Sequence, residues 1–394
     1  MMQPLDDILV VDLTRALAGP FCTVMLSDLG ARVIKIETPD GGDDTRGWGP
    51  PFIGTESAYF LSVNRNKESL TLNLKDERGK DVIHRLLARA DVLVENFRPG
   101  IMHRFGLDYA TLHERYPRLI YAAISGFGQD GPYRELTAYD LILQGMGGLM
   151  GITGEEGGAP VKVGVAVADI CAGMYAAFGV LAALRVRERT GTGQLVDAAL
   201  MDGQVSWLTY AAGIFFATGE NPGRLGSAHP SIVPYQAFQT ADGYMNVAVG
   251  SEAIWARFCD VVDPALAHDP RYRTNPERVA HRRELIDHLE PLFARKTTEE
   301  WGHLLGRAGI PHGPILSMAE VFSHPQVLHR QMVTELDHAT AGRIRQTGIP
   351  VKFSDTPGRI RTAPPTLGQH TDAILRELEY SAAEIAAFRR ERVV

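Results

Sequence analysis

The chain has 394 residues, of which 45% are hydrophobic and 22% are charged, and its formal net charge at pH 7 is −7. These are values of a globular protein with a sizeable core, long enough for about two to three domains. The acidic balance argues against nucleic acid or an anionic membrane as the main partner, while a local basic groove for a phosphorylated cofactor stays compatible with it.

Strand and helix patterns alternate through the N-terminal third of the chain. Apolar runs predict strands at residues 8–13, 32–37, 70–74, 92–97 and 119–125. Helices are predicted between them at residues 16–29 and 76–90. Strands separated by helices of this length form βαβ units, so we expect an α/β fold with a mostly parallel sheet.

Farther along, a long apolar helix is predicted from about Asp169 to Arg189. It has about 15 uninterrupted apolar residues, fewer than a membrane span needs, so we expect a buried core helix. A strand at 194–199 and an apolar helix at 201–217 follow, and residues 218–223 are rich in Gly and Pro, which predicts a domain crossing.

The segment beyond the crossing is predicted to be α+β. A hairpin is expected at residues 235–249, with helices at 252–262, 278–293 and 298–308. The tail from Gln331 is rich in Gly, Pro and Thr, and we expect a long extended connection that ends in a short helix from Ala382.

The cysteines and the N-terminal residues indicate in which cellular compartment the protein is expected. Cys22, Cys171 and Cys259 are far apart and form no Cys-x-x-Cys pair, which favours a reducing cytoplasm and offers no metal or disulfide framework. A basic stretch followed by an apolar one is missing near the N-terminus, so no secretory signal is expected. We therefore expect a cytoplasmic protein without a bound metal.

Several common catalytic motifs are absent. The residues after the first strand, Thr14–Pro20, do not match Gly-x-Gly-x-x-Gly, and the Gly-rich segment Gly145–Gly151 follows a helical pattern rather than a strand. The chain has no Walker A sequence and no Gly-x-Ser-x-Gly elbow. The histidines lack metal-ligand spacing. We therefore expect no nicotinamide or flavin cofactor and no metal.

Basic and aromatic residues follow the ends of two predicted strands. Lys75 ends one strand, Asn96, Phe97 and Arg98 end the next, and Arg104 lies shortly beyond. Groups at the carboxyl ends of parallel strands line a ligand crevice, where arginine could bind phosphates and Phe97 could stack on a base. Solvated loop charges explain the same residues about equally well.

Asp169 is the only charged residue between Val163 and Leu184. A lone charge is costly to bury unless it is paired or hydrogen-bonded, so it needs an explanation. Asp is a favoured N-cap residue, and on the residues alone capping is the better-supported role. The alternative is a carboxylate nucleophile kept ionised by the helix N-terminus, and the two roles are compatible.

Ordered motifs throughout the chain support a family resemblance. They lie at Ala18–Pro20, Asp28–Glu37, Gly42–Arg46, Val94–Gly100, Gly126–Pro132 and Gly368–Thr371. With them, nearly the whole chain resembles the class III CoA-transferases, also known as the carnitine dehydratase/bile-acid-inducible protein F family. Segments Trp48–Ser57, Ser62–Lys67 and Ser231–Phe238 are most similar to members that exchange CoA between succinyl-CoA and glutarate.

The resemblance implies an α/β fold with a Rossmann-like large CoA-binding domain at residues 1–220 plus 330–394. A smaller α+β domain would occupy residues 221–329. Members of the family form interlocked homodimers, so the same arrangement is expected here. The expected partners are an acyl-CoA and a carboxylic acid, with no nucleic acid and no membrane.

The resemblance also implies roles for individual residues. Asp169 matches the family's nucleophile, which would form an aspartyl-CoA thioester. The residues expected to contact coenzyme A are Arg15, Leu17, Ala18, Thr38, Leu72, Asn73, Leu74, Lys75, Asn96, Phe97, Arg98, Arg104, Tyr139 and Asp140. The residues expected near the transferred acid are Trp48, His229 and Gly250, with Arg46 as a further candidate for a distal carboxylate.

The resemblance therefore implies transfer of CoA from succinyl-CoA to a small dicarboxylate such as glutarate, and departures from other members narrow the alternatives. Formyl-CoA:oxalate members carry His and Gln where this chain has Arg15 and Leu17, which counts against oxalate. α-Methylacyl-CoA racemases place a catalytic His at the position of Tyr139, so racemisation is disfavoured. The segment Val249–Glu252 keeps only Gly250 of the family's glycine loop. A non-catalytic CoA-binding module remains the other alternative.

Overall fold

The computed structural model describes residues 2–394. The chain forms two compact units. Unit 1 comprises the residues up to Leu149 together with Lys162–Phe216 and Pro325–Val394. Unit 2 comprises Met150–Val161 and Ala217–His324. Each unit has its own hydrophobic core.

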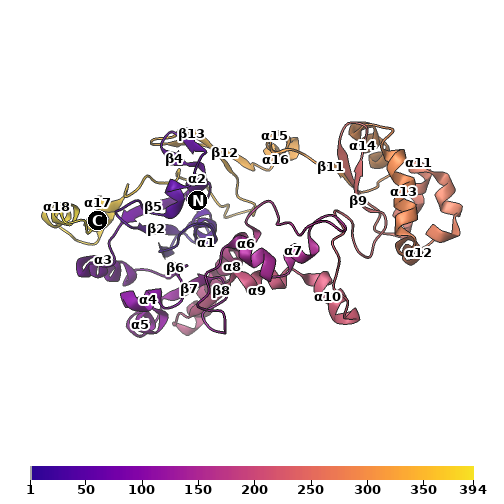
Figure 1. Cartoon of the computed structure of the whole chain (residues 1–394). Coiled ribbons are helices and arrows are strands. Elements are labelled where there is room, and N and C mark those ends of the chain that lie inside the picture. Colours follow the sequence, from indigo (N-terminus) through magenta and orange to yellow (C-terminus); the bar gives the residue numbers. More distant parts are fainter. Residues whose placement is uncertain (1) are drawn as a thin grey trace. The chain divides into compact units, whose positions relative to one another are not determined.

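A six-stranded, all-parallel sheet forms the centre of unit 1 (Figure 1). Its strands, in spatial order, are β5 (Lys67–Thr71), β2 (Arg32–Glu37), β1 (Leu9–Asp12), β6 (Val92–Glu95), β7 (Ile120–Ser125) and β8 (Leu195–Ala199). The predicted parallel α/β sheet is thus confirmed. The strand order reverses between β1 and β6, and the crevice at the carboxyl ends of strands beside such a reversal is where open α/β sheets bind ligands.

Alternating side chains of the strands enter two cores on opposite faces of this sheet. Val10 and Val33 belong to one core, whereas their neighbours Val11 and Ile34 belong to the other. This alternation is the period of two that a strand imposes on its side chains. Both faces are therefore covered, as a parallel sheet requires.

Helices and two small hairpins complete unit 1. The helices are α1 (Ala18–Asp28), α2 (Ala58–Ser62), α3 (Glu77–Leu87), α4 (Ile101–Phe105), α5 (Tyr109–Arg115), α6 (Asp140–Met146), α7 (Leu149–Ile152, at the border with unit 2), α8 (Val167–Thr190), α9 (Leu200–Ser206), α10 (Thr209–Thr218, ending in unit 2), α16 (Pro325–His329), α17 (Thr371–Glu377) and α18 (Ala382–Arg390). The hairpins are β3 (Phe52–Ile53) with β4 (Glu56–Ser57), and β12 (Val333–His338) with β13 (Gly342–Thr347).

The long apolar helix α8 packs in the core of unit 1. It is long and apolar enough to cross a membrane by length and composition, but 56% of its most apolar window is buried. Gly173 lets it approach α1 closely, because a Cβ there would lie 2.5 Å from the Ala18 carbonyl oxygen. Packing against α1 thus accounts for the apolar residues on the buried face of the helix, whereas Phe178 and other apolar side chains on its opposite face are exposed.

The C-terminal residues lie against a loop that follows β5. The Asn73 N–H donates to the Val393 carbonyl oxygen at 2.8 Å. Val393 and Val394 are buried in the same core as Leu72. The C-terminal residues therefore pack against the loop at the carboxyl end of β5, near the C label in Figure 1.

Several predicted elements differ from the structure. Strand β5 begins at Lys67, three residues before the predicted strand, because the buried Lys67 ammonium is hydrogen-bonded and so tolerates a strand interior. The predicted helix at 201–217 divides into α9 and α10, and Thr209, the first residue of α10, has a positive φ of 34°. The predicted extended tail contains the β12–β13 hairpin and α17.

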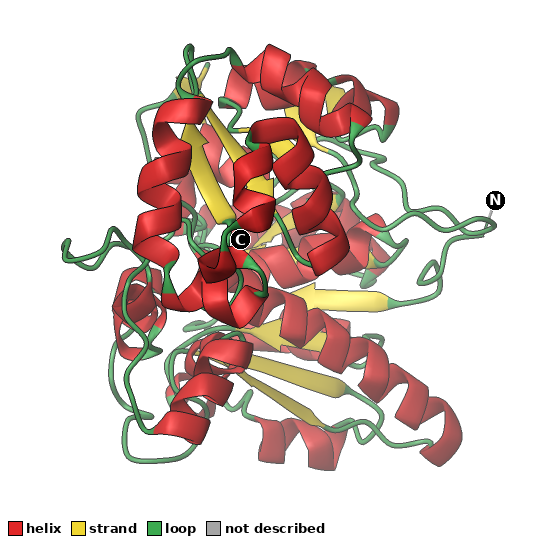
Figure 2. Cartoon of the chain, turned by 90° about the vertical axis from the view of Figure 1, so that its right-hand side faces the viewer, coloured by secondary structure: helices red, strands yellow, loops and turns green. Residues whose placement is uncertain are grey.

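Unit 2 is a small α+β unit, and in Figure 2 its helices lie in front of its strands. The antiparallel order β11 (His312–Pro314), β10 (Tyr244–Ala248) and β9 (Tyr235–Gln239) contains the predicted hairpin. The helices are α11 (Glu252–Val262), α12 (Asn275–Ala280), α13 (Arg282–Phe293), α14 (Thr298–Arg307) and α15 (Met318–Ser323). The predicted helix at 278–293 is interrupted at His281. Stacked aromatic rings such as Phe238 and Phe293, 4.4 Å apart, fill the core.

Candidate active site

Two cavities open at the carboxyl edge of the sheet in unit 1. The first, of about 270 Å³, lies beyond β1, β2 and β5, and the second, of about 370 Å³, contains Asp169. Arg15, after β1, and Phe97, after β6, line both cavities. The guanidinium of Arg15 lies 5.2 Å from the Phe97 ring centroid. The two cavities therefore adjoin at the reversal of strand order.

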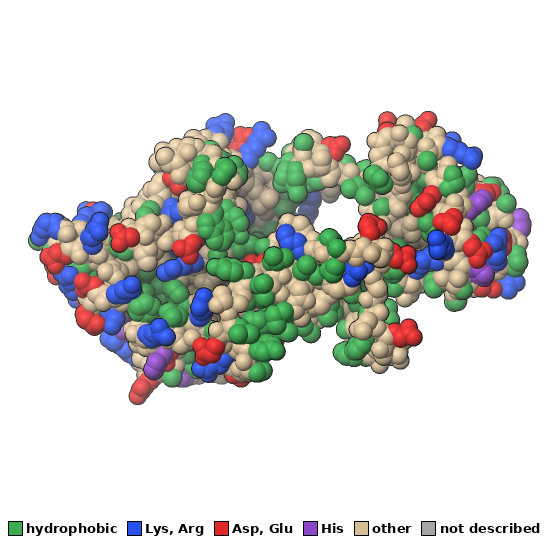
Figure 3. Space-filling view, viewed as in Figure 1, with side chains coloured by type: hydrophobic (Ala, Val, Ile, Leu, Met, Phe, Trp, Pro, Cys, Tyr) green, Lys and Arg blue, Asp and Glu red, His purple; other side chains and the backbone are tan. Residues whose placement is uncertain are grey.

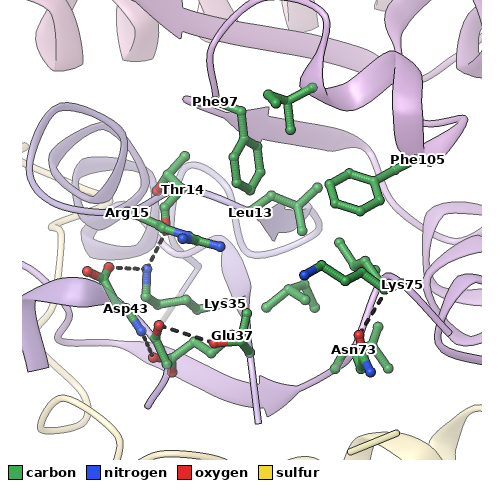
Figure 4. A pocket seen from close by; sticks show the side chains of 16 residues that line it. Leu13, Thr14, Arg15, Lys35, Glu37, Asp43, Asn73, Lys75, Phe97 and Phe105 are labelled. Atoms are coloured by element: carbon green, nitrogen blue, oxygen red, sulfur yellow. Dashed lines mark hydrogen bonds and ion pairs between the residues drawn. The ribbon is translucent and has the colours of Figure 1, made fainter. Parts of the chain in front are cut away.

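The first cavity combines apolar walls with cationic side chains (Figure 4). Phe97, Phe105 and Leu13 form an apolar side, and Arg15 and Lys75 bring positive charge. Arginine and lysine bind phosphates, and a phenylalanine ring offers a stacking surface. The cavity therefore offers contacts for the phosphates and the base of a nucleotide, although no Gly-x-Gly-x-x-Gly motif precedes it.

A buried polar network lies beneath the first cavity. Lys35 pairs with Asp43 at 2.9 Å, and Lys67 pairs with Asp12 at 3.2 Å, with all four side chains fully enclosed. Burial by itself raises the pKa of Asp12, but the positive charges of Lys67 and Lys35 and hydrogen bonds from Thr14 and Thr23 outweigh it and lower the pKa to about 2. The buried ion pairs and hydrogen bonds of this network therefore hold the loops of the site in place.

Asp169 lies in the first turn of α8 and lines the second cavity. The expectation that it caps the helix is wrong, because the N-cap residue is Ala166 and Asp169 lies inside the first turn. Burial first, and then the negative charge of Asp140, raise the pKa of Asp169 to about 7. The carboxyl group is therefore only partly ionised at neutral pH, whereas the sequence predicted a carboxylate kept ionised by the helix N-terminus.

Asp140 positions the beginning of α8 as well as raising the pKa of Asp169. Its Oδ1 accepts a hydrogen bond from the Ala168 N–H at 2.9 Å, and its Oδ2 accepts one from Gln144 Nε2 at 2.7 Å. The residue before it, Tyr139, lies at the N-cap of α6 and lines the cavity with Asp169.

The raised pKa of Asp169 predicts the pH dependence of catalysis. If the carboxylate attacks an acyl-CoA, kcat/KM of the free enzyme should rise with pH through an apparent pKa near 7. Asp140→Asn removes the neighbouring charge, so the rise should move to lower pH and kcat/KM at pH 6 should increase about threefold to tenfold. The measurement is a pH–rate profile of both proteins. An identical acidic limb in the two would contradict the assigned coupling.

Glu95, at the end of β6, is a second buried carboxyl group with a raised pKa. Its Oε2 accepts a hydrogen bond from the Phe97 N–H at 2.8 Å, and its Oε1 accepts one from the Tyr121 hydroxyl at 3.4 Å. Burial is the main cause that raises the pKa of Glu95 to about 7, above its usual value of 4.5. Glu95 therefore holds the loop that carries Phe97 at the expense of stability at alkaline pH.

Glu95→Gln should stabilise the protein at alkaline pH. Because the folded-state pKa is raised, the free energy of unfolding of the unmodified protein falls as pH increases from about 4.5 to beyond 7. Gln stays neutral and its Oε1 still accepts from Phe97 N. We expect the variant to be more stable by about 1–3 kcal/mol at pH 8 and nearly unchanged at pH 5. Denaturant unfolding at both pH values measures this, and a difference independent of pH would contradict it.

Tyr59 was missed by the sequence analysis. Its ring packs edge-on against Trp48, with centroids 5.1 Å apart. Burial and then the charges of Asp169 and Asp140 raise the pKa of Tyr59 to about 12, so its hydroxyl stays protonated near the carboxyl groups. The only signal in the sequence is its position just after the Trp48–Ser57 segment.

Most of the residues expected to bind coenzyme A meet at the two cavities. The first cavity contains Arg15, Thr38, Leu72, Asn73, Leu74, Lys75 and Phe97. The second contains Arg15, Ala18, Asn96, Phe97, Arg98, Tyr139 and Asp169.

Other expected residues lie outside the lining of both cavities. Leu17 is at the N-terminus of α1, Arg104 is within α4, and Asp140 contacts the start of α8. His229 and Gly250 belong to unit 2, whereas Trp48 belongs to unit 1. Arg46 makes a nearly buried, bidentate ion pair with Glu37 at 2.7 and 2.8 Å, so its guanidinium supports the fold and is not offered to a substrate.

The strand order of a Rossmann sheet, with the partly buried Asp169 and a cationic cavity at its carboxyl edge, is typical of α/β proteins that bind nucleotides at this edge. The chain belongs to CoA-transferase family III, whose family model matches residues 5–371. It is therefore an enzyme that transfers coenzyme A.

The chain is similar over nearly its whole length to proteins of that family. It is 47% identical over 378 residues to the succinyl-CoA:glutarate CoA-transferase of Mus musculus, covering 96% of this chain and 87% of that protein. The corresponding protein of Homo sapiens is 45% identical, with 96% and 86% covered. A crystal structure of a CaiB/BaiF family protein from Brucella suis matches with a TM-score of 0.86 and 42% identity, covering 96% of this chain and all of that one.

Proposed function

We propose that the enzyme transfers CoA from succinyl-CoA to glutarate, with Asp169 as the nucleophile. The observation that carries this proposal is the partly buried Asp169 carboxyl group, in a cavity that adjoins a nucleotide-like one at Arg15 and Phe97. The choice of acids is supported by the relatives in mouse and human, which are named for succinyl-CoA and glutarate.

The proposed reaction has four steps. The Asp169 carboxylate attacks the thioester carbonyl of succinyl-CoA, giving a mixed succinyl–aspartyl anhydride and CoA thiolate. The thiolate attacks the aspartyl carbonyl, forming an aspartyl-CoA thioester and releasing succinate. Glutarate then attacks that thioester, which gives a glutaryl–aspartyl anhydride and CoA thiolate again. The thiolate finally attacks the glutaryl carbonyl, releasing glutaryl-CoA and the free Asp169 carboxylate.

The environment of Asp169 suits this chemistry. A carboxylate whose pKa is about 7 is more basic and less hydrated than an ordinary aspartate, and both properties favour attack on a carbonyl carbon. Covalent capture also conserves the thioester energy, because each anhydride is consumed by a thiolate that remains bound. The protonated Tyr59 hydroxyl is the nearby neutral donor for developing negative charge.

In this proposal the first cavity binds the nucleotide end of coenzyme A. Arg15 and Lys75 would contact phosphates and Phe97 would lie against the base, while the thiol end reaches Asp169 past Arg15 and Phe97. Trp48 would border the transferred acid, since it packs on Tyr59. His229 and Gly250 stay predictions for the acid-binding side.

We also propose that the two units act as a CoA-binding domain and a smaller domain in a cytoplasmic homodimer. Support comes from apolar side chains exposed on α8 to α10, a region where Figure 3 shows hydrophobic side chains gathered. Phe178 is 70% exposed, Tyr210 59% and Phe216 81%, and contiguous patches of this kind mark interaction surfaces. The three cysteines are free and buried, which is compatible with a reducing compartment.

The function is tested by supplying succinyl-CoA together with single dicarboxylates of two to six carbons and identifying the new CoA ester by mass spectrometry. Glutarate should give the highest kcat/KM and yield glutaryl-CoA and succinate in equal amounts. Transfer to a different acid with no product from glutarate would refute the substrate assignment. Deuterium exchange into a 2-methylacyl-CoA without any acid acceptor would instead indicate a racemase.

A further inference from the structure

The turn Thr14–Ala16 connects β1 to α1, and Thr14, Arg15 and Ala16 each line at least one of the two cavities. Its backbone groups are held by side chains from other parts of the chain. The Thr14 N–H donates to Asp12 Oδ1 at 2.8 Å, and the Thr14 carbonyl accepts from Lys35 Nζ at 2.7 Å. The conformation of this turn is therefore fixed by side chains rather than by a helix or sheet ladder.

Asn96 holds the middle of the turn from the other side of the strand-order reversal. Its Oδ1 accepts a hydrogen bond from the Arg15 N–H at 2.9 Å, and its Nδ2 donates to the Arg15 carbonyl at 2.7 Å. Both atoms of the amide are thus engaged with one residue's backbone. Since Asn96 follows β6 and Arg15 follows β1, this pair of hydrogen bonds joins the two loops between which the cavities meet.

Asp43 holds Ala16, the last residue of the turn, and Lys35 connects Asp43 to Thr14, the first residue of the turn. Figure 4 shows the contacts of Lys35. Asp43 Oδ1 accepts from the Ala16 N–H at 3.2 Å, and Asp43 pairs with Lys35 at 2.9 Å. Ala16 has a positive φ of 62°, a left-handed conformation that a residue with a Cβ adopts only under external restraint. Arg15 lies between these two supports, with its side chain extending from the turn into the cavity.

We propose that Asn96 is a positioning residue, which fixes the Arg15 turn before coenzyme A arrives, and not a residue whose amide contacts the ligand. The inference rests on the proposed function, because it assigns to the turn the capture of coenzyme A. Preorganised loops bind with less loss of conformational freedom, so loosening the turn weakens binding. The covalent steps at Asp169 are unaffected once the substrate is bound.

Asn96→Ala and Asn96→Asp test this assignment in the full-length enzyme. In the first, both hydrogen bonds are lost; in the second, one oxygen still accepts from Arg15 N, but the other faces the Arg15 carbonyl and cannot donate to it. For both variants we expect amide hydrogen exchange at Arg15 in the ligand-free protein to become at least about tenfold faster. The Kd of coenzyme A, measured by calorimetry, should rise about tenfold, while kcat at saturating substrate changes less than about threefold.

The matched control is Asn73→Ala, an asparagine of the same cavity whose Oδ1 accepts only from the nearby Lys75 N–H at 3.1 Å. This control should leave exchange at Arg15 unchanged whatever it does to coenzyme A binding. Weaker binding in the Asn96 variants with unchanged exchange would show a direct ligand contact and overturn the proposal. Faster exchange with unchanged binding would overturn it too, because the position of the turn would not matter.

Failure of the proposed function is a separate outcome. If the unmodified enzyme did not bind coenzyme A, the proposed function would fail together with this role. That result is recognised because it appears without any substitution. The exchange measurement reports on the Asn96–Arg15 contact in either case.

Discussion

Asp169→Asn is expected to abolish CoA transfer, with a loss of at least about 10⁴-fold in kcat. The amide cannot attack the thioester, so no aspartyl-CoA intermediate forms, whereas coenzyme A binding should persist because the first cavity is intact. After incubation with succinyl-CoA and treatment with hydroxylamine, the unmodified enzyme should carry a mass change on the peptide containing Asp169. The variant should carry none.

Asp202→Asn is the matched control for this result. Asp202 is likewise in the first turn of a helix of unit 1, α9, but it is exposed and does not line either cavity. It should keep activity and the hydroxylamine-dependent mass change. Transfer that survives in Asp169→Asn, or a mass change on another peptide, would refute the assigned nucleophile.

A stability measurement separates loss of chemistry from loss of folding. The pKa of Asp169 is raised to about 7, so ionising it costs folding free energy as pH increases from its usual value of 3.8. Asp169→Asn should therefore unfold at a higher denaturant concentration than the unmodified enzyme at pH 8, and at a similar concentration at pH 4. A variant that is inactive yet more stable is the signature of a functional residue.

Lys67→Met is expected to have the largest effect on stability, lowering the free energy of unfolding by about 3–5 kcal/mol. Lys67 donates to Asp12, Pro20 and Asn64 at 3.0 to 3.2 Å, and it is fully enclosed. Without the ammonium group, the Asp12 carboxylate stays buried without its nearest positive charge. Urea unfolding followed by circular dichroism measures the loss.

The double variant Asp12→Asn/Lys67→Met should recover part of that loss, because no unpaired charge is left and the asparagine oxygen still accepts from Thr14 or Thr23. Lys80→Met is the control, since Lys80 pairs with the exposed Glu77 at the helix surface. Such a pair contributes at most about 1 kcal/mol. Equal losses for Lys67→Met and Lys80→Met would contradict the role of the buried pair.

The fold could be predicted where local patterns determine it. The apolar strands β1, β2, β6 and β7 and the helices α1 and α3 follow from local patterns, whereas the short helices α2, α4 and α5 were not predicted. Strand β5 was misplaced because it begins with Lys67, and a lysine predicts a strand interior poorly unless its partner Asp12, distant in the sequence, is known. The β12–β13 hairpin was missed because its strands, VTELDH and GRIRQT, contain few apolar residues and so show no clear apolar alternation.

The candidate site shows the same difference between features that local sequence patterns predict and contacts between residues distant in the sequence. Asp169 was conspicuous as a lone charge in an apolar helix, and residues at strand ends were identified by the rule that parallel strands share a carboxyl edge. The contacts that shape the site could not be predicted, since Asn96 pairs with Arg15 of another loop, and Lys35 of β2 pairs with Asp43 of the loop beyond that strand. Arg46 is the opposite case. Its charge suggested a substrate contact, but its guanidinium is paired with Glu37.

The contact between Asn73 and Val393 has a consequence for biosynthesis. A loop of the first cavity is made early, but the backbone oxygen that it binds is added only when synthesis reaches Val393. At about 5–20 residues per second, the nascent chain holds that loop without its support for tens of seconds. The loop therefore stays without this hydrogen bond until synthesis reaches Val393, and the support of the first cavity is complete only from that point.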